Sequence, residues 1–211
     1  MNWIERMYEI KGKDLYSQNG EGILLEYIFN AIGFNAIGTK YHSFVDIGGG
    51  DGFYLSNTRH LANLDVWYGV VLDAENGIFI TLDNVDEYVN EHYDLISIDI
   101  DGNDYWILDH IMKYKPRVVI AEFNAMYHDS RTIKYNPEHI WAGDSYYGFT
   151  FDAGVKLAEK HGYKVIFQIA DMNMIMVRED LIKGLYIPPV TYKQSDYFQM
   201  SGRPDSDWLW I

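Results

Sequence analysis

Cysteine is absent from this sequence of 211 residues. Its absence excludes disulfides, thiolate zinc sites, iron–sulfur clusters and cysteine nucleophiles. Long hydrophobic runs are missing as well, because no stretch approaches the roughly 18 apolar residues that a membrane-spanning helix needs. The composition therefore predicts a soluble protein without a membrane partner, and the length favours one domain over residues 1–211.

Basic residues are scarce. Lys and Arg total 17 against 31 Asp and Glu, which gives a net charge of −14 when His is neutral. Such a charge repels polyanions, so we expect no nucleic-acid partner. The first residues, 1–6, lack a basic start followed by an apolar run, which predicts that there is no signal peptide and that the protein is cytoplasmic.

Short apolar segments alternate with helical patterns along the chain. β-branched and aromatic residues predict strands over 42–47, 66–73, 94–100, 117–123, 164–169 and 174–178. Apolar residues at helical spacing follow Gly20 and recur over 104–114 and 151–161. This alternation predicts an α/β fold with a mostly parallel sheet, whose ligands bind beyond the carboxyl ends of the strands.

Two segments lie outside this alternation. Residues 124–150 are polar and aromatic with weak periodicity, and such long loops in compact domains are usually functional or disordered, so we expect a substrate lid there. Residues 179–211 form an aromatic tail that ends in Trp208-Leu209-Trp210-Ile211. We expect these aromatics to pack onto the domain or onto a second copy in a homo-oligomer.

A glycine-rich loop follows the first predicted strand. Gly48, Gly50 and Gly52 let the backbone turn sharply and approach a ligand, although a plain glycine turn is the alternative. The NAD fingerprint needs a small residue three positions after Gly50, where this chain has Phe53. Asp46 would repel a pyrophosphate and would attract an ammonium group, so a cofactor that carries an amino acid fits better than NAD.

The order Asp-x-Gly-x-Gly-x-Gly over residues 46–52 resembles motif I of class I S-adenosylmethionine-dependent methyltransferases. Three further motifs are similar to those of the FkbM-like methyltransferases: Ser-Gln-Asn-Gly-Glu at 17–21, Ser-Asn-Thr at 56–58 and Ile-Asp-Ile-Asp-Gly-Asn-Asp-Tyr at 98–105. The resemblance covers about residues 16–178. It implies a Rossmann-like sheet of about seven strands with flanking helices and S-adenosyl-L-methionine as the cofactor.

The resemblance also implies roles for individual residues. Residues 46–52 would wrap the methionine part of the cofactor, and Asp73, at the end of the second predicted strand, would accept hydrogen bonds from the ribose hydroxyls. A solvated surface carboxylate is the alternative for Asp73. Gln18 and Glu21 would lie near the cofactor or the acceptor, whereas the residues alone indicate only a helix start with a favourable acid in its first turn.

The chain departs from the family pattern directly after Asp73. Four residues, 74–77, separate it from the next apolar run at 78–81, whereas a parallel crossover needs about 10–12 residues. The usual helix between the second and third strands therefore cannot be present. Either 78–81 is not a parallel strand or the edge of the sheet is rebuilt, and no adenine contact can be assigned.

Acidic residues follow the fourth and fifth strands of the family pattern. Alternation points Asp99 and Asp101 in one direction, and Glu122 and Asn124 end the next strand, so these four side chains are expected to converge. Oxygen donors suit Mg²⁺, and metal-dependent O-methyltransferases of the macrocin type have a similar arrangement. We predict a metal site at Asp101, Glu122 and Asn124, with helix capping or direct orientation of substrate as alternatives.

Methyl transfer needs alignment, exclusion of water and removal of the acceptor's proton. Asp99, Asp101 and His128 are the candidate catalytic residues, although a single histidine in a loop is often only a surface residue. The aromatic residues of the 124–150 loop would line an acceptor pocket or simply pack. The sequence thus predicts methyl transfer to a hydroxyl of a small molecule or sugar, and the alternative is a non-catalytic cofactor-binding or assembly protein on the same scaffold.

Overall fold

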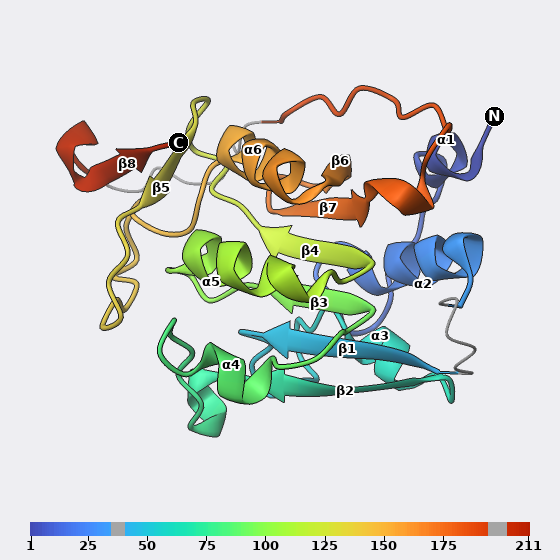
Figure 1. Ribbon diagram of the computed structural model, residues 1–211, viewed down its shortest axis with the longest axis horizontal. Helices are drawn as coiled ribbons and strands as arrows, with labels where there is room; N and C mark the ends of the chain where they lie inside the picture. Colours follow the sequence, from blue (N-terminus) through green and yellow to red (C-terminus); the bar gives the residue numbers. More distant parts are fainter. Residues whose placement is uncertain (35–40, 194–201) are drawn as a thin grey trace.

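The computed structural model describes residues 1–34, 41–193 and 202–211. Its centre is a six-stranded sheet in the order β2-β1-β3-β4-β7-β6 (Figure 1). The strands are β1 (His42–Ile47), β2 (Trp67–Leu72), β3 (Leu95–Ile98), β4 (Val118–Glu122), β6 (Tyr163–Ile169) and β7 (Asn173–Arg178). β7 runs antiparallel to both of its neighbours, and the other described pairings in this sheet are parallel. The predicted α/β fold with a mostly parallel sheet is confirmed.

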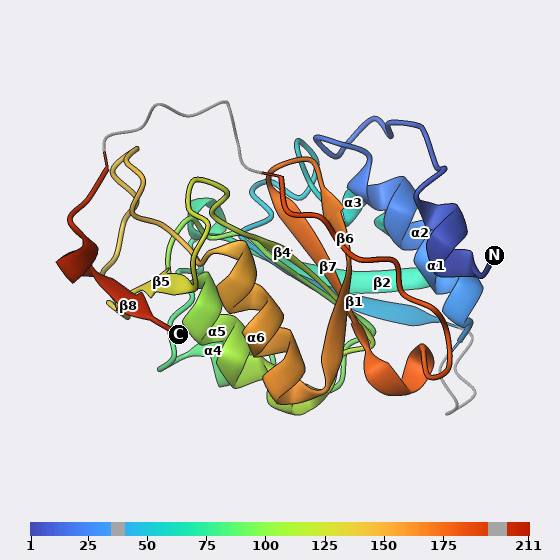
Figure 2. The same ribbon diagram turned by 90° about the horizontal axis from the view of Figure 1, so that it is seen from above.

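Helices cover both faces of the sheet (Figure 2). One layer holds α1 (Trp3–Met7), α2 (Glu21–Ile32) and α3 (Arg59–Ala62), and the other holds α4 (Val85–Tyr88), α5 (Asp104–Ile111) and α6 (Phe151–His161). The described ranges also contain short 3₁₀ turns: η1 (Ala74–Asn76), η2 (Met112–Tyr114), η3 (Glu179–Leu181) and η4 (Asp205–Asp207). No helix in those ranges is long and apolar enough to span a bilayer.

Alternation along the strands builds two apolar cores. In β1, Val45 and Ile47 pack in the cluster that includes α5 and α6, while Phe44 packs in the cluster that includes α1 and α2. The central strands β1, β3 and β4 are buried on both faces along almost their whole length, which is why they read as continuous apolar runs rather than as alternating patterns. α6 has the predicted bounds, and it ends at Gly162, which has φ +83°. That left-handed conformation is the usual glycine stop of a helix.

The segment after β2 is not a strand, so the central sheet has six strands in the described residues, where about seven were expected. Asp73 leads directly into η1, and residues 78–81 then continue without strand pairing. Ile80 from this segment is only 5% exposed and packs in the core of the α5 face. β2 therefore remains at the edge of the sheet, because four linking residues are too few to carry the chain back to a further parallel strand.

Residues 124–150 are joined to the end of the chain. β5 (Arg131–Ile133) pairs antiparallel with β8 (Trp208–Trp210), beyond the edge at which β1, β3 and β4 end (Figure 1). The Arg131 guanidinium lies over the rings of Trp208 and Trp210 and forms ion pairs with Asp129 and Asp205. The described part of the 179–211 tail therefore packs onto the same chain; residues 194–201 of that tail lie outside the described ranges.

Candidate active site

The glycine loop lies against the end of β3. Gly48 has φ +88°, and a methyl group on it would come within 1.6 Å of the carbonyl oxygen of Asp99. Gly50 and Gly52 also have positive φ values, of +56° and +70°. The loop therefore needs glycine at 48 for two reasons, its backbone conformation and the close approach of β3.

Asp46 lies beneath this loop and is only 2% exposed. Its carboxylate accepts a hydrogen bond from Thr58 Oγ1 at 2.8 Å, with Ser56 Oγ at 3.4 Å. Burial raises the pKa of Asp46. A side chain on Gly49 would collide with the Asp46 carboxyl, so that glycine makes room for it. Asp46 thus supports the glycine loop through these contacts, and its role toward a cofactor stays a prediction.

Asp73 lies at the end of β2, where the sequence places it, and it lines a cavity. One carboxylate oxygen accepts the N–H of Gly50 at 2.9 Å, and the other accepts the N–H of Glu75 at 2.7 Å. A carboxylate offers about four acceptor positions, so both oxygens keep capacity for a further donor. Asp73 therefore couples the glycine loop to η1 and remains able to bind a hydroxyl group.

The cavity has a volume of about 230 Å³ and opens at the carboxyl edge of the sheet. Its walls come from the end of β1, the end of β2 with the segment after it, the turn after β3, and one residue of the 124–150 loop. The lining residues are Gly48, Leu72, Asp73, Ala74, Ile78, Phe79, Ile80, Asp99, Ile100, Asp101, Gly102, Asn103 and His139. Three carboxyl groups and, among the described residues, no Lys or Arg line it, so its electrostatic potential disfavours phosphates.

Three carboxyl groups meet beside the cavity. Oxygen atoms of Asp99, Asp101 and Glu122 lie within 4.8 Å of one another. Burial and the neighbouring acids raise the pKa of Asp99 to about 8 and that of Asp101 to about 6, and they raise the pKa of Glu122 well above its usual range. Asp99 and Glu122 are hydrogen-bonded to each other, and the second Glu122 oxygen is buried without a partner. The group therefore holds shared protons near neutral pH.

The turn after β3 fixes Asp101 in an uncommon backbone conformation. Its φ is +51°, in the left-handed region that non-glycine residues rarely adopt. The Asp104 carboxylate holds this turn by accepting the N–H groups of Ile100 and Gly102, both at 2.8 Å. Asp104 is fully buried, so the acid that begins α5 serves to shape the turn that presents Asp101.

Two further predicted site residues, Asn124 and His128, have contacts of their own in the 124–150 loop and the chain end. Asn124 is fully buried; its amide nitrogen donates to the carbonyls of Ser145 and Tyr147, and its oxygen accepts the N–H of Met126. Those bonds connect the start of the 124–150 loop to its end, which gives Asn124 a structural role; metal binding by Asn124 stays a prediction. His128 does not line the cavity, and its ring contacts that of Tyr192 with centroids 4.0 Å apart.

Glu21 is fully buried at the first position of α2, directly after Gly20. Its carboxylate accepts the backbone N–H of Asn19 at 2.7 Å and the side-chain amide of Asn173 at 3.2 Å. Glu21 does not line the cavity. Its contacts join the segment before α2 to the start of β7, and its contact with a cofactor stays a prediction.

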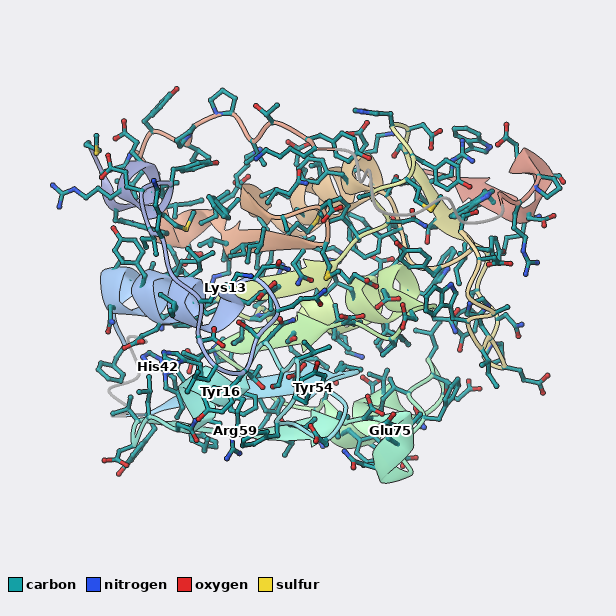
Figure 3. The ribbon with its side chains drawn as sticks, turned by 180° about the vertical axis from the view of Figure 1, so that it is seen from behind. Lys13, Tyr16, His42, Tyr54, Arg59 and Glu75 are labelled. Atoms are coloured by element: carbon teal, nitrogen blue, oxygen red, sulfur yellow. The ribbon has the colours of Figure 1, made fainter. Side chains whose placement is uncertain are left out.

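Sequence reasoning missed His139, which lines the cavity from the 124–150 loop. The sequence carried only a weak hint of this role: a histidine stands inside a long loop that follows a strand of the predicted active site. Arg59, which does not line the cavity, has its guanidinium over the Phe53 ring at 4.9 Å and the Tyr16 ring at 6.0 Å; Arg59 and Tyr16 are labelled in Figure 3.

The chain matches no family profile, and no curated protein is detectably similar to it in sequence. Among solved structures, it is similar to the CurJ carbon methyltransferase, with 11% identity and a TM-score of 0.41 over 74% of this chain and 53% of that chain. Magnesium protoporphyrin IX methyltransferase (ChlM) from Synechocystis PCC 6803 gives 12% identity and a TM-score of 0.36 over 83% and 93%. The O-methyltransferase NcsB1 of neocarzinostatin biosynthesis gives 16% and 0.35 over 74% and 56%. The chain thus spans about half the length of the CurJ and NcsB1 chains.

Proposed function

We propose that this protein transfers a methyl group from S-adenosyl-L-methionine to a hydroxyl group of a small molecule or sugar. The observation that carries the proposal is the cavity at the sheet edge, which combines Gly48, the strand-end acid Asp73 and an acidic lining. Ligands of such sheets bind at this edge. A sulfonium ion is cationic and suits an acidic site, whereas a dinucleotide would bring a pyrophosphate into it.

The residues of the cavity fit the nucleoside part of such a ligand. Asp73 is held by Gly50 and Glu75, and its remaining lone pairs make it the proposed acceptor for two ribose hydroxyls. Gly48 and Gly50 carry no side chains, so a ligand could approach the backbone of the glycine loop at these positions. Leu72, Ile78 and Ile80 supply apolar surface for a base in place of the missing crossover helix.

The bound cofactor would supply an electrophilic methyl group, and the protein's own task is to align the acceptor and remove its proton. We assign proton removal to the carboxyl pair of Asp99 and Glu122. A group with a pKa near the working pH is the most effective general base, and the pKa of Asp99 is raised to about 8 by burial and by its acidic neighbours. Asp101, in the same cluster, is the proposed group that positions the acceptor hydroxyl.

Replacement of Asp73 by Asn tests the cofactor assignment. We expect S-adenosyl-L-homocysteine to bind the wild type and to bind Asp73→Asn at least about tenfold more weakly, because two charge-assisted hydrogen bonds become weaker. Isothermal titration calorimetry measures both affinities. Glu75→Gln is the matched control, since Glu75 is an exposed neighbour in η1 (Figure 3) and is expected to bind normally. No binding to the wild type would overturn the proposal, and binding without methyl consumption would favour the non-catalytic alternative.

Mg²⁺ at the same carboxyl cluster, with Asp99, Asp101 and Glu122 as ligands, is the proposed alternative to proton removal by Asp99 and Glu122. A metal ion bound there would lower the pKa of the acceptor hydroxyl instead. Since ligands must lose their protons, Mg²⁺ binding at pH 7 is expected to release protons. We expect Asp101→Asn to weaken it about tenfold or more, as measured by calorimetry in buffers of different ionisation enthalpy. Glu75→Gln, at an exposed position, is the control. Full turnover in the presence of a chelator would exclude the metal and leave proton transfer to the acids alone.

A further inference from the structure

The outer edge of β2 is open. β2 is the last strand at its end of the sheet, and within the described ranges no strand pairs with its other side (Figure 1). The carbonyl of Val66 points toward β1, where it accepts the N–H of His42 at 2.7 Å. Backbone groups alternate in direction along a strand, so those of Gly69 and Val71 point away from β1. This edge therefore presents donors and acceptors to which a further strand can bond.

A row of apolar side chains lies beside these backbone groups. Val66, Tyr68 and Val70 are 38%, 60% and 43% exposed, and they are called the apolar row below. The row lies on the α5 side of the sheet, because Val70 pairs with Val45, which packs in the core of that side. No crossover helix covers the row, since residues 74–77 alone link β2 to the next apolar segment. β2 thus combines an open edge with an uncovered apolar face.

β2 also lacks the features that usually prevent edge strands from pairing. Natural edge strands carry charged residues, proline or bulges, or they are covered by other segments. Residues 66–72 read Val-Trp-Tyr-Gly-Val-Val-Leu, without a charged residue or a proline. The pairing of β2 with β1 runs without a register shift. Asp65 and Asp73 flank the segment, so its whole length is uncharged and regular.

The opposite edge of the same sheet, at β6, is protected. The pairing of β6 with β7 contains a register shift, an irregularity that makes an edge a poor template. The Tyr8 hydroxyl donates to the carbonyl of Ile166 at 3.0 Å. The Gln168 side chain donates to the carbonyl of Lys193 and accepts its N–H, both at 3.1 Å. The residue after α1 and the 179–211 tail therefore contact β6, whereas no such contact protects β2 in the described ranges.

We propose that two copies of this chain pair through their β2 edges and form a closed two-fold dimer with one continuous sheet. Each copy has an open edge at β2 and a protected edge at β6, so head-to-tail pairing of β2 with β6 is blocked. Pairing of β2 with β2 satisfies both open edges at once and leaves no free edge for a third copy. The partner is therefore a second copy of this chain.

The apolar rows of the two copies are self-complementary. A two-fold axis makes the paired strands antiparallel, and the outward groups of Gly69 and Val71 then bond to their counterparts. Even-numbered residues thus lie opposite even-numbered residues on the same face, so each apolar row continues into the other. Tyrosine beside valine across two strands is the kind of pair that stabilises a sheet. The inference does not depend on the proposed methyl transfer, because residues 66–71 do not line the cavity.

Analytical ultracentrifugation of the full chain over a range of concentrations tests the proposal. We expect the wild type to form a species of twice the 24.6 kDa chain mass. Tyr68→Lys places a charge in the apolar row, and the two-fold axis brings the charges of both copies together, so the dimer should be at least about tenfold weaker. Tyr186→Lys is the matched control at a similarly exposed tyrosine, and it is expected to leave the dimer intact.

Two measurements on the wild type need no variant. The amides of Gly69 and Val71 are expected to exchange their hydrogens more slowly as the protein concentration rises, because they become bonded across the dimer. Each copy carries a net charge of −14, so added salt should strengthen the dimer by screening the repulsion between copies.

A wild type that stays monomeric up to about 100 µM would overturn the proposal. A dimer that Tyr68→Lys does not weaken, without added protection at Gly69 and Val71, would overturn it as well, because another surface would then carry the association. Assemblies that grow beyond the dimer would contradict the closed two-fold arrangement. If Tyr68→Lys does not fold, Val70→Lys in the same apolar row and the hydrogen exchange of the wild type decide the matter.

Discussion

Gly48→Ala is expected to destabilise the protein by about 3 kcal/mol or more, the sum of a strained left-handed backbone and a steric collision in a packed region. The backbone at Gly48 has φ +88°, and the added methyl group would come within 1.6 Å of the Asp99 carbonyl oxygen. That oxygen belongs to the backbone at the end of β3 and cannot rotate away. Urea unfolding followed by circular dichroism measures the change in the free energy of unfolding.

Gly50→Ala is the matched control for this prediction. Its φ is +56°, but no atom lies within 4 Å of the position that a methyl group would take. The substitution therefore carries only the backbone cost, about 1–2 kcal/mol. Equal losses at the two positions would contradict the steric argument and would show that the loop can move away from β3.

The strands and the longer helices were predictable because local patterns determine them. β1 and α6 have the predicted bounds, since apolar runs between turn residues and a glycine stop act within a few residues. The glycine spacing likewise predicted a tight loop. It could not show that Gly48 is the sterically required position, because the obstructing carbonyl comes from Asp99, which is distant in the sequence.

Strand alternation could predict the direction of the Glu122 side chain but not that of Asn124, because alternation ends with the strand. Glu122 is the last residue of β4, so the alternation of side chains along the strand still predicts which way its side chain points. Asn124 lies beyond the strand end, where the chain turns into the loop and its amide binds loop carbonyls. Strand periodicity therefore carried no information about Asn124, although the same pattern brought Asp99 near Glu122 correctly.

The structure brings His139 and not His128 to the cavity, for a related reason. His128 is closer in sequence to the predicted site, but the loop first leads away from it and is tied to the chain end by the pairing of β5 with β8. The loop then returns, and Asn136 docks on Asn103 so that His139 reaches the cavity. Pairing between segments so far apart leaves no local pattern in a single sequence.

Asp99→Asn is expected to lower the rate of methyl transfer by about 10²–10⁴-fold, the usual contribution of a general base. Asparagine has nearly the shape of aspartic acid and can still bond to Glu122, but it cannot accept the acceptor's proton. Single-turnover kinetics with saturating cofactor isolate this step. Cofactor affinity should change little, because Asp73 and the glycine loop are untouched, and Glu75→Gln is the control at an exposed acid. A rate close to that of the wild type would exclude Asp99 as the base.

The same substitution is expected to make the protein more stable at alkaline pH, which separates catalytic loss from unfolding. The pKa of Asp99 is about 8 in the folded state, where burial is the main cause, against 3.8 for an ordinary aspartate. Between these values the folded chain keeps a proton that the unfolded chain has released, so wild-type stability falls as the pH rises from about 4 to about 8. An asparagine side chain cannot ionise, and the stability advantage of Asp99→Asn should therefore grow over that interval and level off above it. Urea unfolding in chelator at several pH values measures this difference; an advantage that stays constant with pH would mean that Asp99 is already ionised in the folded protein.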